Sequence, residues 1–248
     1  MTIELTWTSL SVPSSDSLSG RSVVVVDALR ATSTIATALD NGAAGIIPIA
    51  TVEEARACYA DLPGALLSGE RGSLKMEGFD LGNSPLEYTP EVVAGKTIVM
   101  TTTNGTHALS VSHGANEIIC GSLLNASAVA RHLVDSGCSR LLVVCAGTHG
   151  AFSLDDAVAA GAIIDRLVTL DSSEHSFDDA ATAALILFRS VVDDIPSAFI
   201  RSLHGRRLLE LGLGDDVRYC ASVDILDIVP VLTGSSIAPA TTPVVIRP

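Results

Sequence analysis

The chain contains 248 residues, of which 15 are Lys or Arg and 28 are Asp or Glu, so its formal net charge is −13. This charge disfavours nucleic acid or an anionic membrane as a partner, since both are bound by basic surfaces. It permits a small anionic substrate held by a few cations or a metal. Hydrophobic residues make up 48% and charged residues 17% of the chain, which excludes a disordered protein. The length suits a single domain over residues 1–248, with closely packed lobes at about 1–135 and 136–248 as an option.

Five scattered cysteines form no Cys-x-x-Cys pair, a usage that suits a reducing cytosol better than a disulfide framework. The first twenty residues lack the basic and apolar pattern of a signal peptide. No run of about 18 apolar residues occurs, so we expect no transmembrane helix. These patterns predict a cytoplasmic protein.

Short apolar runs alternate with helix-like stretches along the first half of the chain. The apolar runs are typical of buried strands, and Thr51 and Glu54 have the spacing of a helix-capping box. Residues 69–95, which are rich in Gly, Pro and Asn, predict a long ordered loop. The expected strands cover 23–26, 46–49, 65–67 and 97–100, and the expected helices cover 31–39, about 51–60 and a short segment after 101–106.

The second half continues the alternation, with a polar surface loop expected at 171–178 and a weakly structured tail from Gly234. The expected strands are 117–120, 141–145 and a late one at 217–220, and the expected helices are about 125–134, 153–170, 178–192 and 197–211. This order predicts an α/β fold, layered α/β/α, with a mostly parallel or mixed sheet. Ligands bind outside the carboxyl ends of the strands in such sheets.

Unusual polar segments follow four of the expected strands. In a parallel sheet these segments would meet at one edge and bring together carboxylates, guanidinium groups, hydroxyls and glycine-rich backbone. The segments are 27–34 (DALRATST), 68–72 (SGERG), 101–106 (TTTNGT) and 145–156 (CAGTHGAFSLDD).

This set of groups has a chemical logic. Carboxylates suit Mg²⁺, which binds through one or two of them together with substrate phosphate and water. Arginine forks match the oxygens of phosphate or sulfonate, and helix N-termini and glycine-rich turns present N–H groups to anions. Together they predict a metal-assisted phosphoryl site.

Each residue also has a plain structural interpretation. Asp27 could cap the following helix, and Arg30 could be solvated on it. Glu70 and Arg71 could form an exposed charge pair, Asn104-Gly105 could be a simple turn, and Asp156 could pair with Ser153 at a helix start.

Cys145 and His149 lie in one loop and suggest a second chemistry, a thiol nucleophile with an imidazole base. The alternative for Cys145 is a small buried thiol. The segment 202–205, SLHG, is typical of surface or packing in a late helical region.

The ordered combination of these strings resembles the 2-phosphosulfolactate phosphatase family. The matches run in family order from about residue 20 to residue 230, with a weaker part in SLHGRRLLELG (202–212), DVRYC (216–220) and IVP (228–230). The stronger segments are VVVVDALRATSTIATAL (23–39), LLSGERGSLKMEGFDLGNSPLEY (66–88), TTTNGTHAL (101–109), GSLLNASAVA (121–130) and VVCAGTHGAFSLDDAVAAGAII (143–164).

The resemblance implies a Mg²⁺-dependent phosphatase that converts 2-phospho-3-sulfolactate to 3-sulfolactate and phosphate, a step in coenzyme M biosynthesis. It also implies a family-specific α/β fold with the site in a cleft. The family motifs map onto Asp27, Arg30, the Gly-Glu-Arg of 69–71, the element 78–85 and the Thr-Asn-Gly-Thr of 103–106.

We infer the roles of these positions from chemistry. Haloacid-dehalogenase-type phosphatases carry a second aspartate two residues after their nucleophile, and here that position is Leu29, so Asp27 is assigned to the metal. Water oriented by the metal would attack the phosphorus. The expected Mg²⁺ ligands are Asp27, Glu70 and Asp155; the expected catalytic residues are Asp27, Arg30, Glu70 and Arg71; and the expected substrate-binding residues are Thr32, Asn83, Thr103, Asn104, Gly105, Thr106 and Gly147.

Two other functions stay open on the sequence. One is a cysteine hydrolase that uses Cys145 and His149, and the other is a non-catalytic protein that binds an anionic metabolite. The expected partner is a small phosphorylated anion, and a mean hydropathy of +0.45 leaves room for a homodimer.

Overall fold

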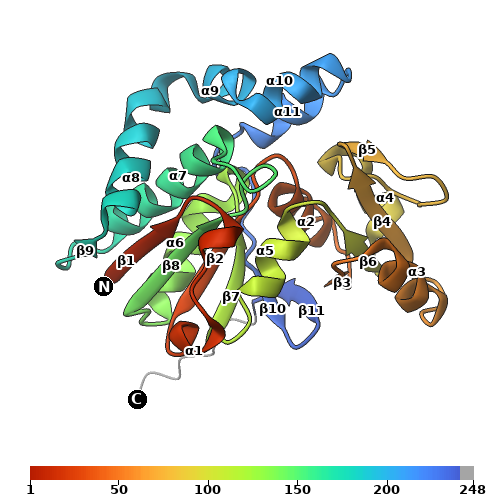
Figure 1. Ribbon diagram of the computed structural model, residues 1–248, viewed down its shortest axis with the longest axis horizontal. Coiled ribbons are helices and arrows are strands. Elements are labelled where there is room, and N and C mark those ends of the chain that lie inside the picture. The colour runs from red at the N-terminus through yellow and green to blue at the C-terminus, as the bar shows by residue number, and fades with distance from the viewer. Residues whose placement is uncertain (241–248) are drawn as a thin grey trace.

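A computed structural model describes residues 1–240 as one eleven-stranded sheet with helices packed against it (Figure 1). The strand order is β5-β4-β6-β3-β11-β10-β7-β2-β8-β1-β9. The strands are β1 (Thr2–Thr6), β2 (Ser22–Val26), β3 (Gly45–Pro48), β4 (Leu66–Arg71), β5 (Leu74–Lys75), β6 (Thr97–Thr101), β7 (Glu117–Gly121), β8 (Arg140–Cys145), β9 (Ser176–Phe177), β10 (Pro230–Thr233) and β11 (Ser236–Pro239).

The helices alternate with these strands as the sequence predicts, and short 3₁₀ turns lie at Ser9–Ser11, Pro85–Glu87, Leu123–Asn125 and Val192–Asp194. Within the described residues, none of the helices has the length and apolar character needed to cross a membrane. The α-helices are α1 (Ser15–Leu18), α2 (Ala31–Asp40), α3 (Val52–Ala60), α4 (Pro90–Val93), α5 (Gly105–Val111), α6 (Ala126–Asp135), α7 (Leu154–Leu170), α8 (Asp179–Val191), α9 (Ile195–Arg201), α10 (Leu203–Glu210) and α11 (Gly214–Cys220).

The sheet consists of two parallel blocks. The first block contains β7, β2, β8 and β1, with β9 at its edge. The second block contains β3, β6 and β4, and it carries the short antiparallel strand β5. The hairpin β10–β11 joins them through three successive antiparallel pairs, β7–β10, β10–β11 and β11–β3. The sheet is therefore mixed and mostly parallel, and its two blocks are distinct units of the architecture (Figure 1).

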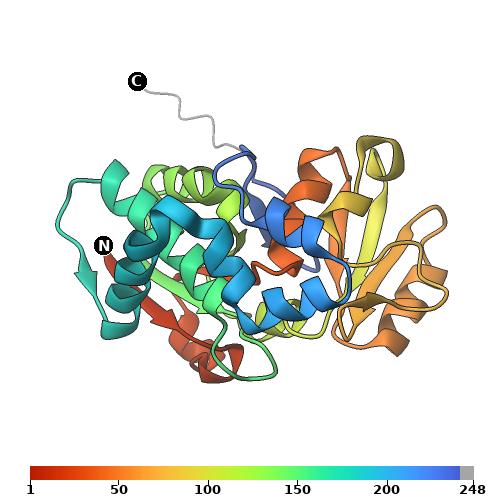
Figure 2. The same ribbon diagram turned by 90° about the horizontal axis from the view of Figure 1, so that it is seen from above.

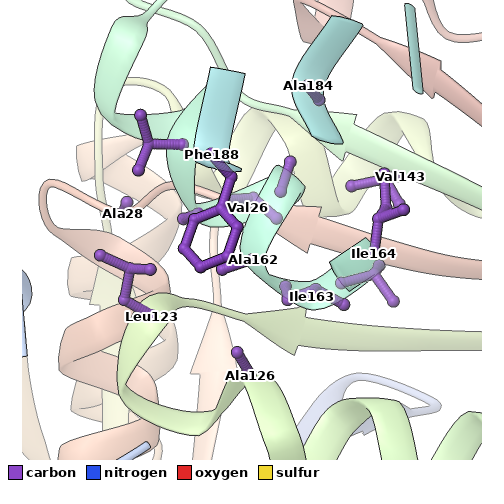
Figure 3. Packing of buried hydrophobic residues seen from close by; sticks show 14 of the residues in the cluster. Val26, Ala28, Leu123, Ala126, Val143, Ala162, Ile163, Ile164, Ala184 and Phe188 are labelled. Atoms are coloured by element: carbon purple, nitrogen blue, oxygen red, sulfur yellow. The ribbon is translucent and has the colours of Figure 1, made fainter. Parts of the chain in front are cut away.

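Alternate residues of the central strands face two different cores, as the period of a strand requires. On β2, Val24 and Val26 pack with α6, α7 and α8, whereas Val23 and Val25 pack with α2 and α5. Figure 3 shows Val26 and Val143 near Phe188 and Ala184 of α8. Burial of each of these valines contributes roughly 1.5–3 kcal/mol, so the first block is a rigid support for the loops at its strand ends.

The second block has a smaller core of its own, in which Ala55 of α3 packs with Leu67, Phe79 and Val99. The helix α3 begins as expected, because the Thr51 hydroxyl accepts a hydrogen bond from the Glu54 N–H and donates one to the Glu54 carboxylate. The long loop expected at 69–95 is partly regular, since β4 extends to Arg71 and β5 and α4 follow.

Two expectations at the end of the chain differ from the structure. The strand expected at 217–220 is wrong, because these residues belong to α11, whose buried side chains Asp216, Val217 and Cys220 follow a helical period. The tail expected from Gly234 to be weakly structured contains β11, and its residues 241–248 lie outside the described chain.

Candidate active site

Three aspartates meet at the carboxyl ends of β2 and β8, which are adjacent parallel strands. Asp27 follows β2, and Asp155 and Asp156 begin α7. The Asp156 carboxylate accepts hydrogen bonds from the Ala28 N–H at 2.8 Å and the Gly147 N–H at 2.9 Å. It therefore ties the loop after β2 to the loop after β8, a role different from the helix-start pairing that its spacing with Ser153 suggests.

Asp27 and Asp155 each have one carboxylate oxygen engaged by a protein donor. Asp27 Oδ1 accepts from the Ala31 N–H at 3.3 Å, and Asp155 Oδ1 accepts from the Ser153 hydroxyl at 2.8 Å. Both side chains are buried. Burial raises the pKa of Asp27 to about 7, and the charges of Asp155 and Glu70 add to this rise.

Burial also raises the pKa of Asp156 well above its ordinary value, with Asp155 and Asp27 as further causes. Two raised pKa values in one cluster mean that like charges are confined in a poorly solvated place. A cation bound among these side chains would relieve that repulsion.

The second block contributes Glu70 at the end of β4. Its Oε1 accepts hydrogen bonds from the N–H and the hydroxyl of Thr103, both at 2.8 Å, and its Oε2 accepts from the Ser73 N–H at 2.8 Å. The preceding residue must be glycine, because a Cβ at Gly69 would lie 2.2 Å from the Thr101 carbonyl oxygen. Glu70 therefore holds the loops after β4 and β6 in a fixed relation.

The strand-end loops of the two blocks touch each other directly. A Cβ added to Gly105 would lie 2.5 Å from Ala31 Cβ and 2.9 Å from Asp27 Oδ2, so α5 approaches the Asp27 loop as closely as glycine allows. The Arg30 guanidinium donates to the Ser73 carbonyl oxygen at 2.6 Å, and the His149 N–H donates to Asn104 Oδ1 at 3.4 Å. The four polar segments thus converge, as the sequence predicts.

The convergence forms a narrow crevice that opens into a larger outer cavity. The crevice, lined by Asp27, Arg30, Asn83 and Thr102 among others, has a volume of about 10 Å³, which is close to the room that one water molecule needs. The outer cavity has a volume of about 350 Å³. Residues shared by both linings are Glu70, Ser73, Asn104 and His204.

Two buried polar atoms of the crevice residues have no hydrogen-bond partner within residues 1–240, namely Arg30 Nε and Asn83 Oδ1. Buried polar atoms are seldom left unpaired in folded proteins. A donor and an acceptor without partners in residues that line the same crevice are consistent with a small polar occupant.

The helices α9 to α11 lie across the top of the molecule between its two halves, as Figures 1 and 2 show. Asp216 of α11 is buried, forms an ion pair with Arg30, and accepts a hydrogen bond from the Ser84 hydroxyl at 2.7 Å. His204 of α10 contacts the Ser73 hydroxyl through Nε2 at 3.2 Å, and burial lowers its pKa. These contacts hold the helices over the crevice.

Sequence reasoning missed His204, Asp216 and Ser73 as site residues. His204 lies in SLHGRRLLELG, which we interpreted as surface or packing, and Asp216 begins the DVRYC segment. Their place in the ordered family resemblance was the signal that could have identified them.

Several predicted site residues support the loops without lining either cavity. The Thr32 hydroxyl accepts a hydrogen bond from the Asp27 N–H and donates one to the Asp27 carbonyl, both at 3.0 Å. In the same manner, the Thr106 hydroxyl accepts a hydrogen bond from the Thr102 N–H at 3.4 Å and donates one to the Thr102 carbonyl at 2.9 Å. The Arg71 guanidinium donates to the Glu70 carbonyl at 2.7 Å and to the Thr101 hydroxyl at 3.2 Å. Of the other predicted residues, Glu70, Thr103 and Asn104 line the outer cavity, whereas Asp155, Gly105 and Gly147 line neither cavity.

The geometry does not support a cysteine nucleophile. Cys145 is fully buried, and burial together with Asp156 and Asp155 raises the pKa of its thiol well above the ordinary value. His149 lies in an exposed turn and lines the outer cavity. A nucleophilic cysteine needs a lowered pKa and an adjacent base, so Cys145 is a structural thiol.

Residues 1–240 contain no group of three or more His, Cys, Asp or Glu side chains arranged to hold a metal ion. This result concerns sites in which protein side chains supply most of the ligands of the metal. Mg²⁺ is usually held by one or two carboxylates, with waters and substrate phosphate completing the shell.

Comparison with known proteins identifies one family. A family model described as 2-phosphosulpholactate phosphatase matches residues 8–235. A probable 2-phosphosulfolactate phosphatase of Caldanaerobacter subterraneus subsp. tengcongensis is 49% identical over 217 residues, which is 87% of this chain and 89% of the relative. Proteins with the same description from Thermotoga maritima and Clostridium acetobutylicum are 46% and 43% identical, over 86% and 90% of this chain and 89% and 94% of the relatives.

Proposed function

Because the chain belongs to the 2-phosphosulpholactate phosphatase family, we propose that it hydrolyses the phosphate monoester of 2-phospho-3-sulfolactate, or of a related 2-phospho-carboxylic acid, with Mg²⁺ as cofactor. The products are 3-sulfolactate and phosphate. The observation that carries the proposal is the buried aspartate cluster at a crevice that opens into a cavity of about 350 Å³.

The residues present fit a magnesium ion. Asp27 and Asp155 would hold it, since each has one carboxylate oxygen that accepts from a protein donor and a second that accepts none within the described residues. Glu70, whose oxygens already accept three hydrogen bonds, would contribute through water. When bound, the ion would supply positive charge that neutralises the negative charge developing on the phosphate.

The chain's own groups would position the phosphate. Arg30 is fixed by Asp216 and the Ser73 carbonyl, so its positive charge stands beside the crevice without free rotation. Its Nε and the Asn83 amide oxygen line the crevice as unpaired polar groups. Asn104, which lines both cavities, would orient the ester through its side-chain amide, whereas Thr103 would act through Glu70, to which its N–H and its hydroxyl both donate.

Hydrolysis requires a water oxygen to bond to phosphorus while the bond from phosphorus to the C2 oxygen breaks. The water loses a proton and the leaving oxygen gains one. We assign the transfer of this proton to the imidazole of His204, which lines both the crevice and the outer cavity. The imidazole would accept the proton from the water and pass it to the leaving oxygen. Burial lowers its pKa, so it is neutral at pH 7 and can accept a proton.

A phosphate-release assay tests the proposal with 2-phosphosulfolactate, 2-phospholactate and phosphoglycerate as substrates. We expect turnover with Mg²⁺, highest for 2-phosphosulfolactate, a loss of at least 100-fold in EDTA, and recovery when Mg²⁺ is restored. Near-normal turnover in EDTA would remove the metal from the proposal. Tight binding of these esters without any release of phosphate would instead support a non-catalytic binding protein.

A further inference from the structure

The substrate class proposed above carries three anionic groups, and the crevice has few cations to meet them. The two terminal nitrogens of Arg30 are engaged by Asp216 and Ser73, and Arg71 is bonded to Glu70 and Thr101. Neither guanidinium presents a free fork to a second anion. A free cation for the second anionic group must therefore come from another part of the molecule.

The helix α10 presents such groups to the outer cavity. Besides His204, four of its residues line that cavity, and these four follow the spacing i, i+3, i+4 and i+7, which is one face of a helix. They are Leu203, Arg206, Arg207 and Glu210. The opposite face is packed into the protein through Gly205 and Leu208, so the helix keeps these four positions on the side of the cavity.

The two arginines on this face are available to a ligand. Arg206 is exposed, and its guanidinium forms no hydrogen bond or ion pair with any residue from 1 to 240. Arg207 forms an ion pair with Glu210 at 3.3 Å, in which both side chains are more than half exposed. Exposed pairs of this kind contribute about 0–1 kcal/mol, so a ligand anion can replace the Glu210 carboxylate.

The position of α10 is fixed relative to the crevice. His204 contacts Ser73, which donates its N–H to Glu70, and the neighbouring helix α11 is anchored through Asp216. The crevice and the outer cavity share four lining residues, so one substrate can extend from the first into the second.

From this arrangement we propose that Arg206 and Arg207 form the subsite for the sulfonate of 2-phosphosulfolactate. The inference rests on the proposed function. The carboxylate and the phosphate ester share carbon C2, so both stay near the crevice, whereas the sulfonate on C3 extends one carbon further. Guanidinium forks bind the oxygens of such an anion in pairs. The two arginines thereby set the preference for sulfonated over sulfonate-free esters.

Steady-state kinetics on two substrates test the subsite. The variants are Arg206→Ala, Arg207→Ala and the double variant, assayed with 2-phosphosulfolactate and with 2-phospholactate, which lacks the sulfonate. We expect the double variant to raise KM for 2-phosphosulfolactate at least 30-fold with kcat changed less than threefold, and to change KM for 2-phospholactate about twofold. Equal losses on both substrates, or no loss on either, would overturn the proposal.

Arg218→Ala is the matched control, because Arg218 lies on the adjacent helix α11 and forms a similar exposed pair with Asp215. It should leave both KM values unchanged. Binding of the product analogues separates this inference from the proposed function. If the wild-type chain releases no phosphate from either ester, the proposed function fails, and calorimetry with 3-sulfolactate and lactate still tests the subsite. At least tenfold tighter binding of 3-sulfolactate, lost in the double variant, supports it; equal binding of the two overturns it.

Discussion

The two blocks of the sheet each place carboxylates at the same crevice, but they treat them in opposite ways. Glu70, from the second block, accepts three hydrogen bonds from loops of its own block. Asp27 and Asp155, from the first block, accept one each, and they lie beside a third buried carboxylate whose pKa is raised. The carboxylate of the second block is thus paired with hydrogen-bond donors, whereas the carboxylates of the first block repel one another.

This difference separates structural from reactive carboxylates. A carboxylate that accepts several protein hydrogen bonds is stabilised in its charged form and holds the backbone around it. A carboxylate that is buried beside others raises the free energy of the protein until a cation arrives. The stability of variants should therefore change in opposite directions at Asp27 and at Glu70, although activity falls at both.

Asp27→Asn should give the largest effect. It removes a carboxylate that we propose as a ligand of Mg²⁺, so we expect turnover to fall by about 10³-fold. The metal-free protein should become more stable by on the order of 2 kcal/mol at pH 8, because the folded protein no longer confines that charge. Phosphate release and urea unfolding in EDTA measure the two effects.

The gain in stability should depend on pH. The fold raises the pKa of Asp27 from its ordinary value of 3.8 to about 7, so the folded state holds an extra proton between these two pH values. The free energy of unfolding of the metal-free wild type should therefore fall as pH rises from about 4 to 7, and the advantage of the variant should be larger at pH 8 than at pH 5. Asp215→Asn, at an exposed position, is the control. A variant less stable than wild type at pH 8 would contradict this account of the cluster.

Glu70→Gln should have a smaller effect on turnover and the opposite effect on stability. The substitution replaces one carboxylate oxygen, which accepts hydrogen bonds, by an amide NH₂ group, which donates them. The N–H of Ser73 or of Thr103 that donates to that oxygen therefore loses its acceptor. We expect a loss of about 1.5–3 kcal/mol in the free energy of unfolding and roughly 30-fold in turnover.

The same urea unfolding and phosphate-release assays measure the Glu70 variant. Glu53→Gln on the exposed surface of α3 is its control and should leave both quantities unchanged. If Glu70→Gln stabilised the protein as Asp27→Asn does, the contrast between the blocks would not hold.

Gly105→Ala tests the contact between the blocks, with the smallest expected effect on turnover. The new methyl group would meet Ala31 and the Asp27 carboxylate, so α5 must move away from the loop after β2. We expect about tenfold lower turnover and a loss of about 1–3 kcal/mol in the free energy of unfolding. Gly214→Ala is matched to it, because its Cβ meets a flexible leucine side chain at 3.0 Å. Equal behaviour of the two variants would mean that the close approach at Gly105 is unimportant.

The fold was predictable where strands are buried on both faces, since a run such as Val23–Val26 is apolar whatever its neighbours are. The strand β1 was missed although its residues TIELT alternate in polarity, which is the pattern of a half-buried strand. The strands β10 and β11 were not predictable, because they contain Pro and Thr and depend on pairing with distant strands. Residues 217–220 carry a valine and a tyrosine, which favour strands, yet tertiary packing of Val217 and Cys220 makes them helical.

The site was predictable in part for a related reason. Asp27 follows β2 directly, Glu70 lies at the end of β4, and Asp155 begins the helix after β8, so the topology of an α/β sheet brings them to one edge. His204, Arg206 and Arg207 instead lie on α10, in the helical segment 195–220. The expectation that ligands bind at the carboxyl ends of strands does not indicate these residues. The roles of Asp156 and Glu70 as acceptors of backbone N–H groups also depend on contacts between loops that are distant in sequence.

The hairpin β10–β11 has a consequence for how the protein is made. It pairs Val231 with Ile119 and Ile237 with Ile46, so the two blocks are joined into one sheet by strands synthesised long after either block. Contacts between such distant positions close loops that cost much chain entropy and form late in folding. We therefore expect the nascent chain to hold two separately folded strand clusters, and to acquire a working crevice only once residues 230–239 have left the ribosome.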